Sequence, residues 1–280
     1  MNIFKSRFSP SLSLQLSLVF GILFFITSWS HSQNLDVPYV PTPKAVVERM
    51  LDLAHVQPSD YVIDLGAGDG RIVIAAAKRG ASAHGIDLDP QRIKEARQNA
   101  SDAGVNNKVI FKQENIFDTD FSRASVITMY LLPTVNKKLR TKLLNKLEPG
   151  TRIVSHSFDM GEWKADKEVT VSDGNRTHEI YYWVIPAKVT GSWHWSADGK
   201  KFNMDIKQNY QEISVNMSEE NGTAYDIEET ILQGKRIMVR AVNGTHTYIL
   251  NGKVEGNKIK GIIQNHNNTE NSFTLWEASL

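Results

Sequence analysis

The stretch VIDLGAGDGRIVI, residues 62–74, places three glycines at alternate positions between two apolar runs. The first run is short, as in a buried strand, and the second leads into an alanine-rich segment with helical spacing. Glycines between a strand and a helix let the backbone turn sharply and let a ligand lie directly against it. The stretch therefore predicts an α/β domain with a ligand-binding loop, and the alternative is a tight turn that binds nothing.

Strands and helices alternate along the chain after residue 38, which predicts a parallel sheet covered by helices on both faces. We expect a Rossmann-like, doubly wound sheet over residues 33–186. Its first helix should begin at Pro43 with Thr42 as N-cap, and Asp89 should cap a later helix that begins at Pro90. Strands are expected at residues 61–65, 83–87, 109–112, 125–130, 151–156, 168–171 and 179–185, and helices at 43–55, 71–79, 90–103 and 134–147.

The texture changes in residues 187–280, where short alternating runs are separated by turns such as ADGK, ENGT and VNGT. About eight strands at a spacing of ~8–12 residues predict a small antiparallel β-barrel or sandwich. We find no catalytic constellation in this module. His194 and His246 stand alone in the sequence.

Charge and cysteine content exclude several classes of function. The chain has 32 Lys and Arg against 31 Asp and Glu, a formal net charge of +1, so no global field gathers nucleic acid. It has no cysteine, which excludes disulfides, thiolate metal sites and cysteine nucleophiles. We expect no metal. One helix, residues 134–147, is rich in lysine and arginine, which predicts a solvated face or a guide for an acidic partner.

The first 32 residues have the layout of a secretory signal peptide. Lys5 and Arg7 precede an uncharged stretch whose dense apolar part is the eleven residues Leu16–Ile26, and small residues follow. Cleavage after Ser30 or Ser32 fits this layout. The alternatives are an uncleaved membrane anchor through residues 8–30 and a buried or amphipathic arm.

Charge around that segment predicts its orientation. The positive charges lie before it, and none follows until Lys44. By the positive-inside rule, the body of the protein then lies outside the cytoplasm, exported or anchored. An anchor whose body faces the cytoplasm is the alternative.

The residues around the glycines indicate the charge of the ligand. The spacing is G-x-G-x-G, whereas a dinucleotide loop has G-x-G-x-x-G and puts a pyrophosphate on a helix N-terminus. Asp64 precedes the loop and Asp69 lies within it. Carboxylates repel a pyrophosphate but suit an ammonium group, so we expect a cationic nucleoside that bears an amino acid. Asp87, about 20 residues after the first glycine, is placed to bind a ribose diol or else to cap a helix.

At these residues the sequence resembles the class I S-adenosylmethionine-dependent methyltransferases, over about residues 38–186. The resemblance implies that Asp87 holds the ribose and that Glu114 and Asn115 flank the adenine. Many relatives have Asp where this chain has Asn115, and an amide can also pair with adenine. The resemblance implies that the methionine moiety lies against Asp64, Gly66, Ala67, Gly68 and Gly70.

A narrower resemblance is carried by PYVPTP, DLGAGDGRIVIAAAKRGA, MYLLPTVN and GTRIVSHSF. These stretches look like the membrane-associated protein-lysine methyltransferases that modify the adenine nucleotide translocase and the c-ring protein of the ATP synthase. By this resemblance Tyr39 and Thr42 fold over the cofactor, while Tyr130 and Pro133 line the substrate end. A lysine side chain of a protein would be the methyl acceptor. The C-terminal β module departs from that family.

The chemistry that this resemblance implies requires a neutral amine. The cofactor's sulfonium carries the methyl group, and the protein aligns the acceptor nitrogen with it. A lysine has an unperturbed pKa of ~10.4, so a dry aromatic site or loss of a proton to water must supply the free base. His156 is a candidate base, with packing or a hydrogen bond as its other role. The rival hypothesis is an exported, non-catalytic protein that has kept the nucleoside pocket.

Overall fold

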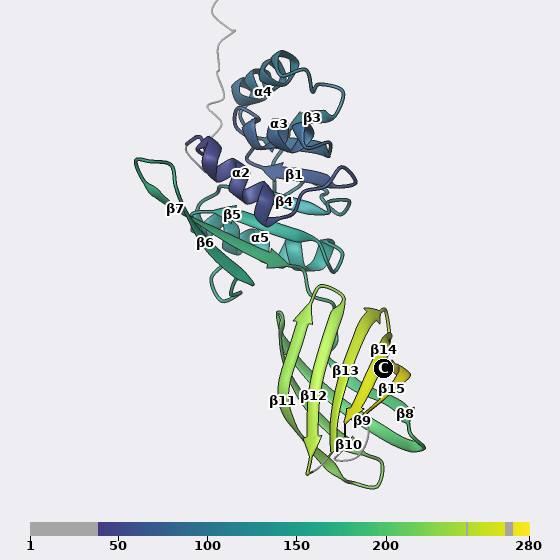
Figure 1. The fold of residues 1–280 in the computed structure, drawn as a ribbon. Helices are drawn as coiled ribbons and strands as arrows, with labels where there is room; N and C mark the ends of the chain where they lie inside the picture. The colour runs from purple at the N-terminus through teal and green to yellow at the C-terminus, as the bar shows by residue number, and fades with distance from the viewer. Residues whose placement is uncertain (1–38, 245, 267–270) are drawn as a thin grey trace, which may run out of the picture. The chain divides into compact units, whose positions relative to one another are not determined.

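The computed structural model describes residues 39–244, 246–266 and 271–280, so the predicted signal or anchor lies outside the described residues. Two regions make up the described chain, a sheet covered by helices and a β-barrel (Figure 1). In the part of the chain that the structure describes, no helix has both the length and the apolar character needed to cross a membrane.

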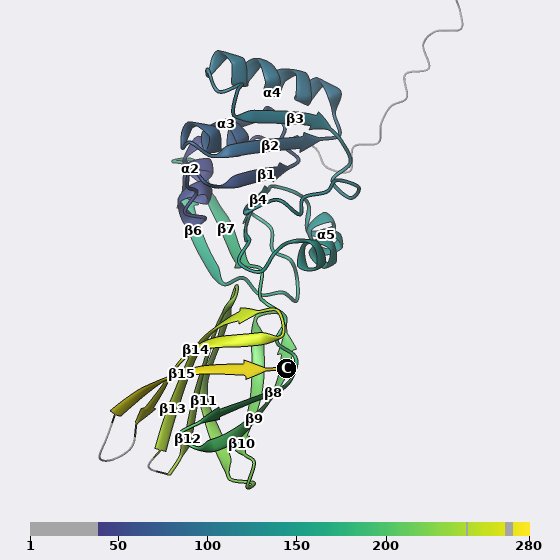
Figure 2. The ribbon, with the colours of Figure 1, turned by 90° about the vertical axis from the view of Figure 1, so that its right-hand side faces the viewer.

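The first region contains a seven-stranded sheet in the order β3-β2-β1-β4-β5-β7-β6. Its first five strands are parallel, and β7 runs antiparallel to both β5 and β6 (Figure 2). The predicted doubly wound α/β sheet is thus confirmed, with an antiparallel pair added at one edge. The strands are β1 (Tyr61–Leu65), β2 (Ser82–Asp87), β3 (Val109–Gln113), β4 (Val126–Met129), β5 (Arg152–His156), β6 (Lys167–Ser172) and β7 (Thr177–Val184).

Helices cover both faces of this sheet, so its inner strands β1 and β4 are buried on both sides. Val62 belongs to the apolar cluster that contains α2, α3 and α4, whereas its neighbour Ile63 belongs to the cluster that contains α5. Strand β1 pairs with both β2 and β4, so the strand order reverses there, and the carboxyl ends of the strands form the usual ligand crevice of such sheets. The helices are α2 (Lys44–Leu53), α3 (Arg71–Lys78), α4 (Pro90–Asp102) and α5 (Pro133–Lys146).

The helix caps agree with the sequence at α4 and differ at α2. Asp89 caps α4 as predicted, since its carboxylate accepts from the N–H of Gln91 at 2.8 Å. The prediction that Thr42 caps the first helix is wrong. Pro43 is the N-cap residue of α2, and within the described ranges no side chain caps this helix. Thr42 fails as a cap because its hydroxyl instead bonds His156, a partner 114 residues away.

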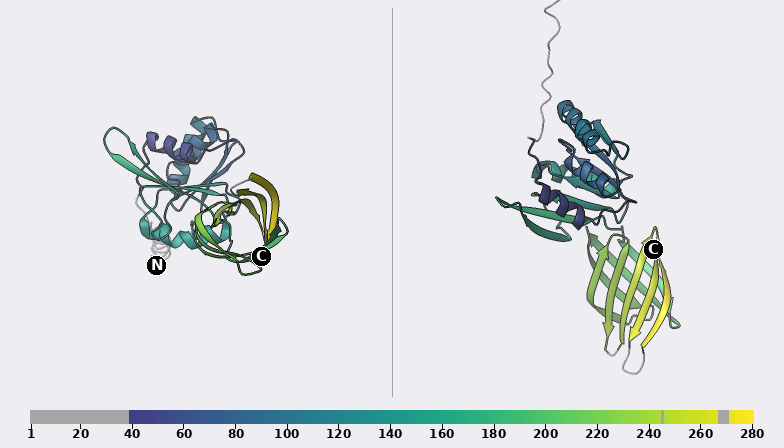
Figure 3. Two further views of the ribbon diagram at one scale, coloured as in Figure 1. Left: turned by 60° about the horizontal axis from the view of Figure 1, so that its bottom comes forward. Right: turned by 45° about the horizontal axis from the view of Figure 1, so that its top comes forward.

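The second region is a closed barrel of eight antiparallel strands, β8 to β15, each paired with the next and closed by β15 against β8 (Figure 3). This confirms the predicted antiparallel β module, as a barrel. Its interior is filled by large apolar side chains such as Trp193, Phe202 and Ile259. The strands are β8 (Gly191–Ala197), β9 (Lys200–Asn209), β10 (Glu212–Glu219), β11 (Ala224–Gln233), β12 (Arg236–Asn243), β13 (His246–Glu255), β14 (Lys258–His266) and β15 (Asn271–Ser279).

Candidate active site

The glycine loop joins β1 to α3 at the carboxyl edge of the sheet. Gly66, Gly68 and Gly70 have φ of +81°, +52° and +81°, a region that favours glycine. A Cβ at Gly66 would lie 2.8 Å from a methyl carbon of Leu131, and one at Gly68 would overlap the ring of Tyr39. The bare backbone is therefore required both by the turn and by the side chains that lie against it.

Asp64, the last polar residue of β1, is buried beneath this loop. Its side chain accepts a hydrogen bond from the Thr128 hydroxyl at 2.7 Å, and the residue is only 2% exposed. Burial raises the pKa of Asp64 to about 7, and the nearby carboxylates of Asp87 and Asp69 add to the rise. The site thus collects negative charge that a cationic ligand would relieve.

Asp87 ends β2 and connects the loop to the start of α4. One of its oxygens accepts from the N–H of Gly68 at 2.8 Å, and the other accepts from the N–H of Asp89 at 2.9 Å. The capping of α4 falls to Asp89. Asp87 is therefore fixed directly beside the glycine loop, where a ribose diol could share its oxygens.

The N-terminal segment is bound to the loop by Arg71, a residue for which the sequence predicted no role. Arg71 forms an ion pair with Asp69 at 2.6 Å and donates to the carbonyl of Thr42 at 2.7 Å. Tyr39 lies against Gly68, and the guanidinium of Arg92 stacks 4.6 Å from the centre of its ring. Tyr39 and Thr42 are thus brought to the loop. In the sequence, the opposite charges of Asp69 and Arg71, two residues apart, were the available signal for this ion pair.

Both residues expected near an adenine already have partners for their side chains. The Glu114 carboxylate accepts from the Thr119 hydroxyl at 3.2 Å and lies 3.4 Å from Nζ of Lys112. Glu114 follows β3, and its N–H donates to the carbonyl of Asp87 at 3.1 Å, so these two residues are neighbours. The side-chain oxygen of Asn115 accepts from the N–H of Phe117 at 2.9 Å and forms a turn. Ala67 lies within the glycine loop, and its N–H donates to the carbonyl of Ile86 at 2.9 Å. The Asn115 oxygen therefore already has a partner in the chain.

Three rings gather where β4 and β5 end. The ring centres of Tyr130 and His156 lie 3.9 Å apart, and Phe158 stacks 6.1 Å from Tyr130. Pro133 opens α5 three residues after Tyr130 and is exposed. Leu131 joins this end to the glycine loop through its contact with Gly66. The predicted substrate-end residues and the predicted cofactor loop therefore adjoin one another.

His156 is 1% exposed and has a partner at each ring nitrogen. Its Nδ1 lies 3.2 Å from the Thr42 hydroxyl, and its Nε2 lies 3.0 Å from Nδ1 of His178. His178 is in turn 3.0 Å from a carboxylate oxygen of Asp173. Burial and the neighbouring His178 lower the pKa of His156 to about 4, so its imidazole is neutral at neutral pH.

Three further residues of the site, His178, Asp173 and Asn136, were not predicted from the sequence. The first two reach the site because β7 pairs antiparallel with β5, a non-local register that no short motif reveals. Asn136 is fully buried in α5, and its Nδ2 donates to the carbonyls of Phe158 and Asp159, both at 3.1 Å. It thereby holds the loop that carries Phe158.

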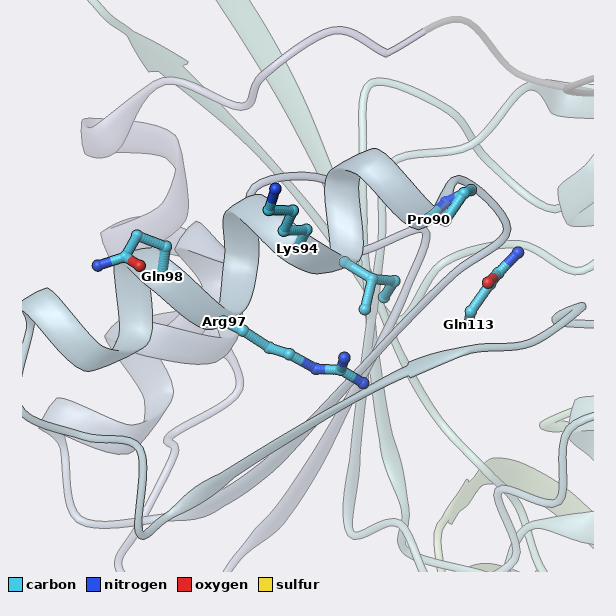
Figure 4. Close-up of a pocket in the computed structure, with 6 residues that line it drawn as sticks. Pro90, Lys94, Arg97, Gln98 and Gln113 are labelled. Carbon is cyan, nitrogen blue, oxygen red and sulfur yellow. The ribbon is translucent and has the colours of Figure 1, made fainter.

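A separate groove of about 430 Å³ lies between α4 and β3 (Figure 4). Arg97 crosses from the helix toward the strand and donates to the carbonyl of Phe111, while Lys94 and Gln98 extend from the helix. None of the residues predicted to bind the cofactor or the substrate lines this groove.

Comparison with known proteins agrees with this geometry. The family model described as the ANTKMT methyltransferase domain matches residues 64–167. A protein-lysine N-methyltransferase of Saccharolobus islandicus is 46% identical over 151 residues, which are 53% of this chain and 94% of that relative. The adenine nucleotide translocase lysine N-methyltransferase of Mus musculus is 35% identical over 47% of this chain, which spans 57% of that relative.

A solved structure is also similar. It is an RNA methyltransferase from Salinibacter ruber in complex with S-adenosyl-L-homocysteine, with 51% identity and a TM-score of 0.51. The likeness covers 54% of this chain and 96% of that one. The names of these relatives agree on methyl transfer and differ on the acceptor.

The site's own residues fit S-adenosyl-L-methionine. The carboxylates of Asp64 and Asp87, which lie beside the glycine loop, would hold the cofactor's amino group and its ribose. The raised pKa of Asp64 reflects a negative site that the cofactor's positive charges suit. The chain therefore belongs to the protein-lysine N-methyltransferase family of class I enzymes that use S-adenosyl-L-methionine.

Proposed function

We propose that this enzyme transfers a methyl group to the side-chain nitrogen of a lysine in a protein. The observation that carries the proposal is the uncharged, aromatic end of the site, formed by Tyr130, His156 and Phe158 beside the glycine loop. Aromatic faces attract an alkylammonium group, and a dry neutral wall favours its loss of a proton. The names of the Saccharolobus and Mus relatives support the same acceptor.

RNA is the second candidate acceptor because the relative from Salinibacter ruber bears that name. The charge of the chain favours a lysine acceptor over RNA. The chain has a net charge of only +1, and the basic helix α5 does not offer all of its charges to a polyanion. Lys142 donates to the carbonyls of Phe117 and Thr119, and Arg140 donates to the carbonyl of Met160. The other lysines of the helix, Lys137, Lys138 and Lys146, are exposed, as expected of a solvated face.

The residues have separable tasks in this reaction. Bound S-adenosyl-L-methionine supplies an electrophilic methyl group on its sulfonium. Asp64, Asp87 and the glycine loop orient the cofactor, and Tyr39 covers the loop. Tyr130 and Phe158 orient the amine and exclude water. His156 is neutral and can receive a proton through its hydrogen-bonded partners.

The acceptor class can be tested with radiolabelled cofactor. The full chain would be incubated with unfolded, alkylated lysozyme or with total RNA, and the product digested with protease or ribonuclease. We expect label in protein, recovered as ε-N-methyllysine by mass spectrometry. Label found only in nucleosides would overturn the lysine proposal, and cofactor binding without any transfer would favour the non-catalytic rival.

We also propose that residues 1–32 direct the chain to a membrane, as a cleaved signal or as an anchor through residues 8–30, with the body outside the cytoplasm. The support is the order of Lys5, Arg7 and the apolar run Leu16–Ile26. Alkaline phosphatase fused at Pro38 should then be active in a bacterial host. An inactive fusion that is present at full length would contradict the orientation.

A further inference from the structure

Four side chains form a continuous hydrogen-bonded line from the interior of the site to the surface. We call Thr42, His156, His178 and Asp173 the histidine relay. Its three links measure 3.2, 3.0 and 3.0 Å. Thr42 and His156 are 4% and 1% exposed, whereas His178 and Asp173 are partly accessible at the hairpin of β6 and β7.

Asp173 fixes the direction of every hydrogen bond in the line. The backbone N–H groups of Arg176 and Asn175 donate to it at 2.8 Å, and together with His178 they lower the pKa of Asp173 to about 2. A carboxylate can only accept, so Nε2 of His178 carries a proton, and in the neutral ring Nδ1 then accepts. Nε2–H of His156 then donates to His178, and Nδ1 of His156 accepts from the Thr42 hydroxyl.

The inner end of the line is at the site described above. The carbonyl of Thr42 accepts from Arg71, which pairs with Asp69 of the glycine loop. The ring of Tyr130 covers His156 at 3.9 Å. The relay therefore begins between the cofactor loop and the aromatic end, where an acceptor amine would be aligned.

We propose that the histidine relay removes the proton from the acceptor amine and delivers it to solvent; this rests on the proposed function. The ammonium gives one proton to the Thr42 oxygen, whose own proton passes to Nδ1 of His156. The Nε2 proton of His156 passes to Nδ1 of His178, which releases its Nε2 proton through Asp173 to water. Each side chain keeps its number of protons, and the freed lone pair of the nitrogen can take the methyl group.

The side chains packed against the relay support proton transfer from Thr42 toward Asp173. His156 meets Tyr130 from the end of β4, Thr42 from the segment before α2, and His178 from β7. In the described part of the chain, the ionisable partner of His178 besides His156 is Asp173, whose carboxylate lies 3.0 Å from Nε2 of His178. These described neighbours of His156 include no carboxylate that could receive the proton directly, so the line through His178 is the route to one that is accessible.

Asp173→Asn tests the polarity of the relay with little change of shape. The amide oxygen can still accept from the backbone, but its NH₂ would donate to Nε2 of His178 and reverse every link. Long-range ¹H–¹⁵N spectra of the full chain report which ring nitrogen carries hydrogen. We expect the Nε2–H form of His156 and His178 in the wild type and the Nδ1–H form in the variant. Wild-type rings in the Nδ1–H form, or rings that do not respond, would overturn the proposal.

The same variant also tests whether Asp173 takes part in proton transfer or only stabilises the structure around His178. Using unfolded, alkylated lysozyme as probe, we expect kcat to fall about 100-fold at pH 7.5, with cofactor affinity changed less than twofold. The deficit should shrink toward pH 10, because solvent then supplies the neutral amine of a lysine with pKa ~10.4. A deficit that is constant with pH, or an unchanged kcat, would overturn the relay.

Glu179→Gln is the matched control. Glu179 is the exposed neighbour of His178 on β7, and its removal deletes the same charge without touching the relay. Its kcat and ring tautomers should equal those of the wild type. If the wild type methylates no protein lysine, the proposed function fails, while the tautomer measurement still decides whether the relay has the inferred polarity.

Discussion

The sheet region and the barrel differ in what they bury. Both have apolar cores, but in the described residues the barrel buries a single polar side chain, Glu219. The sheet region buries ten, namely Thr42, Asp60, Asp64, His84, Thr119, Thr128, Asn136, Thr151, Ser155 and His156. Buried polar groups cost free energy unless they are paired. Five of these ten, namely Thr42, Asp64, Thr128, Asn136 and His156, lie in the candidate site.

Glu219 of the barrel and Asp64 of the sheet region differ in how the chain stabilises their charge. Glu219 is stabilised as a carboxylate by Lys200 at 2.8 Å and Tyr225 at 2.7 Å, and its pKa is lowered. Asp64 has a hydroxyl partner but no cationic partner among the described residues, and its pKa is raised to about 7. Glu219 is satisfied by its own chain, as is Asp60 of the sheet region, which pairs with Arg152 and Ser125 and has a lowered pKa. Asp64, in contrast, awaits a positive ligand.

The largest effect should come from Asp87→Ala, which removes the acceptor for two backbone N–H groups and for the ribose. Because hydrogen bonds to a charged group are lost, we expect the affinity for S-adenosyl-L-methionine to fall by about 100-fold or more in calorimetric titration. Asp226→Ala, an exposed acid on β11, should leave the affinity unchanged. Equal affinity in both variants would break the distinction between the regions.

The next comparison substitutes one glycine in each region and measures the loss of stability and of cofactor binding. Gly68 and Gly256 both have positive φ, at +52° and +65°, but only Gly68 has a ring against it. Gly256→Ala should cost about 1–2 kcal/mol from the left-handed backbone alone. Gly68→Ala should cost more than this in urea unfolding and should also weaken cofactor binding, because the Tyr39 ring must move. Similar costs and intact binding would show that the loop tolerates a side chain.

The Asp64→Asn variant tests the raised pKa of Asp64 through the pH dependence of stability and of cofactor affinity. Because the pKa of Asp64 is raised to about 7 from its ordinary 3.8, the folded protein holds an extra proton between pH 4 and 7, and its free energy of unfolding falls as pH rises through that window. The variant should lack this fall. Wild-type cofactor affinity should rise up to tenfold per pH unit toward pH 7 and then level, while the variant binds weakly and evenly at each pH. A flat wild-type profile would contradict the raised pKa.

Glu219→Gln should give the smallest effect. It replaces a carboxylate that Lys200 and Tyr225 stabilise and should cost about 1–2 kcal/mol in urea unfolding at pH 7. Since the pKa of Glu219 is lowered from 4.5, this difference should disappear as the pH falls below 4.5. Cofactor affinity should stay the same. A changed affinity would mean that the barrel's buried acid serves the sheet region's site.

Local patterns in the sequence predicted the parts of the fold that depend on local chemistry. The glycine loop, the alternation of strands and helices, the cap at Asp89 and the eight-stranded module follow from spacing and turn residues. Thr42 was misassigned because its local pattern is that of a cap while its partner, His156, is distant in sequence. His178 and Asp173 were missed for the same reason, since an antiparallel register brings them in.

The most direct test of the central claim is hydrogen–deuterium exchange of the full chain with and without S-adenosyl-L-methionine. We predict slower exchange in residues 62–70 and 84–89, which form the loop around Asp64 and the end of β2, and unchanged exchange in barrel strands β10 to β13. Protection confined to the barrel, or none anywhere at saturating cofactor, would contradict the assignment of the buried carboxylates as the cofactor site.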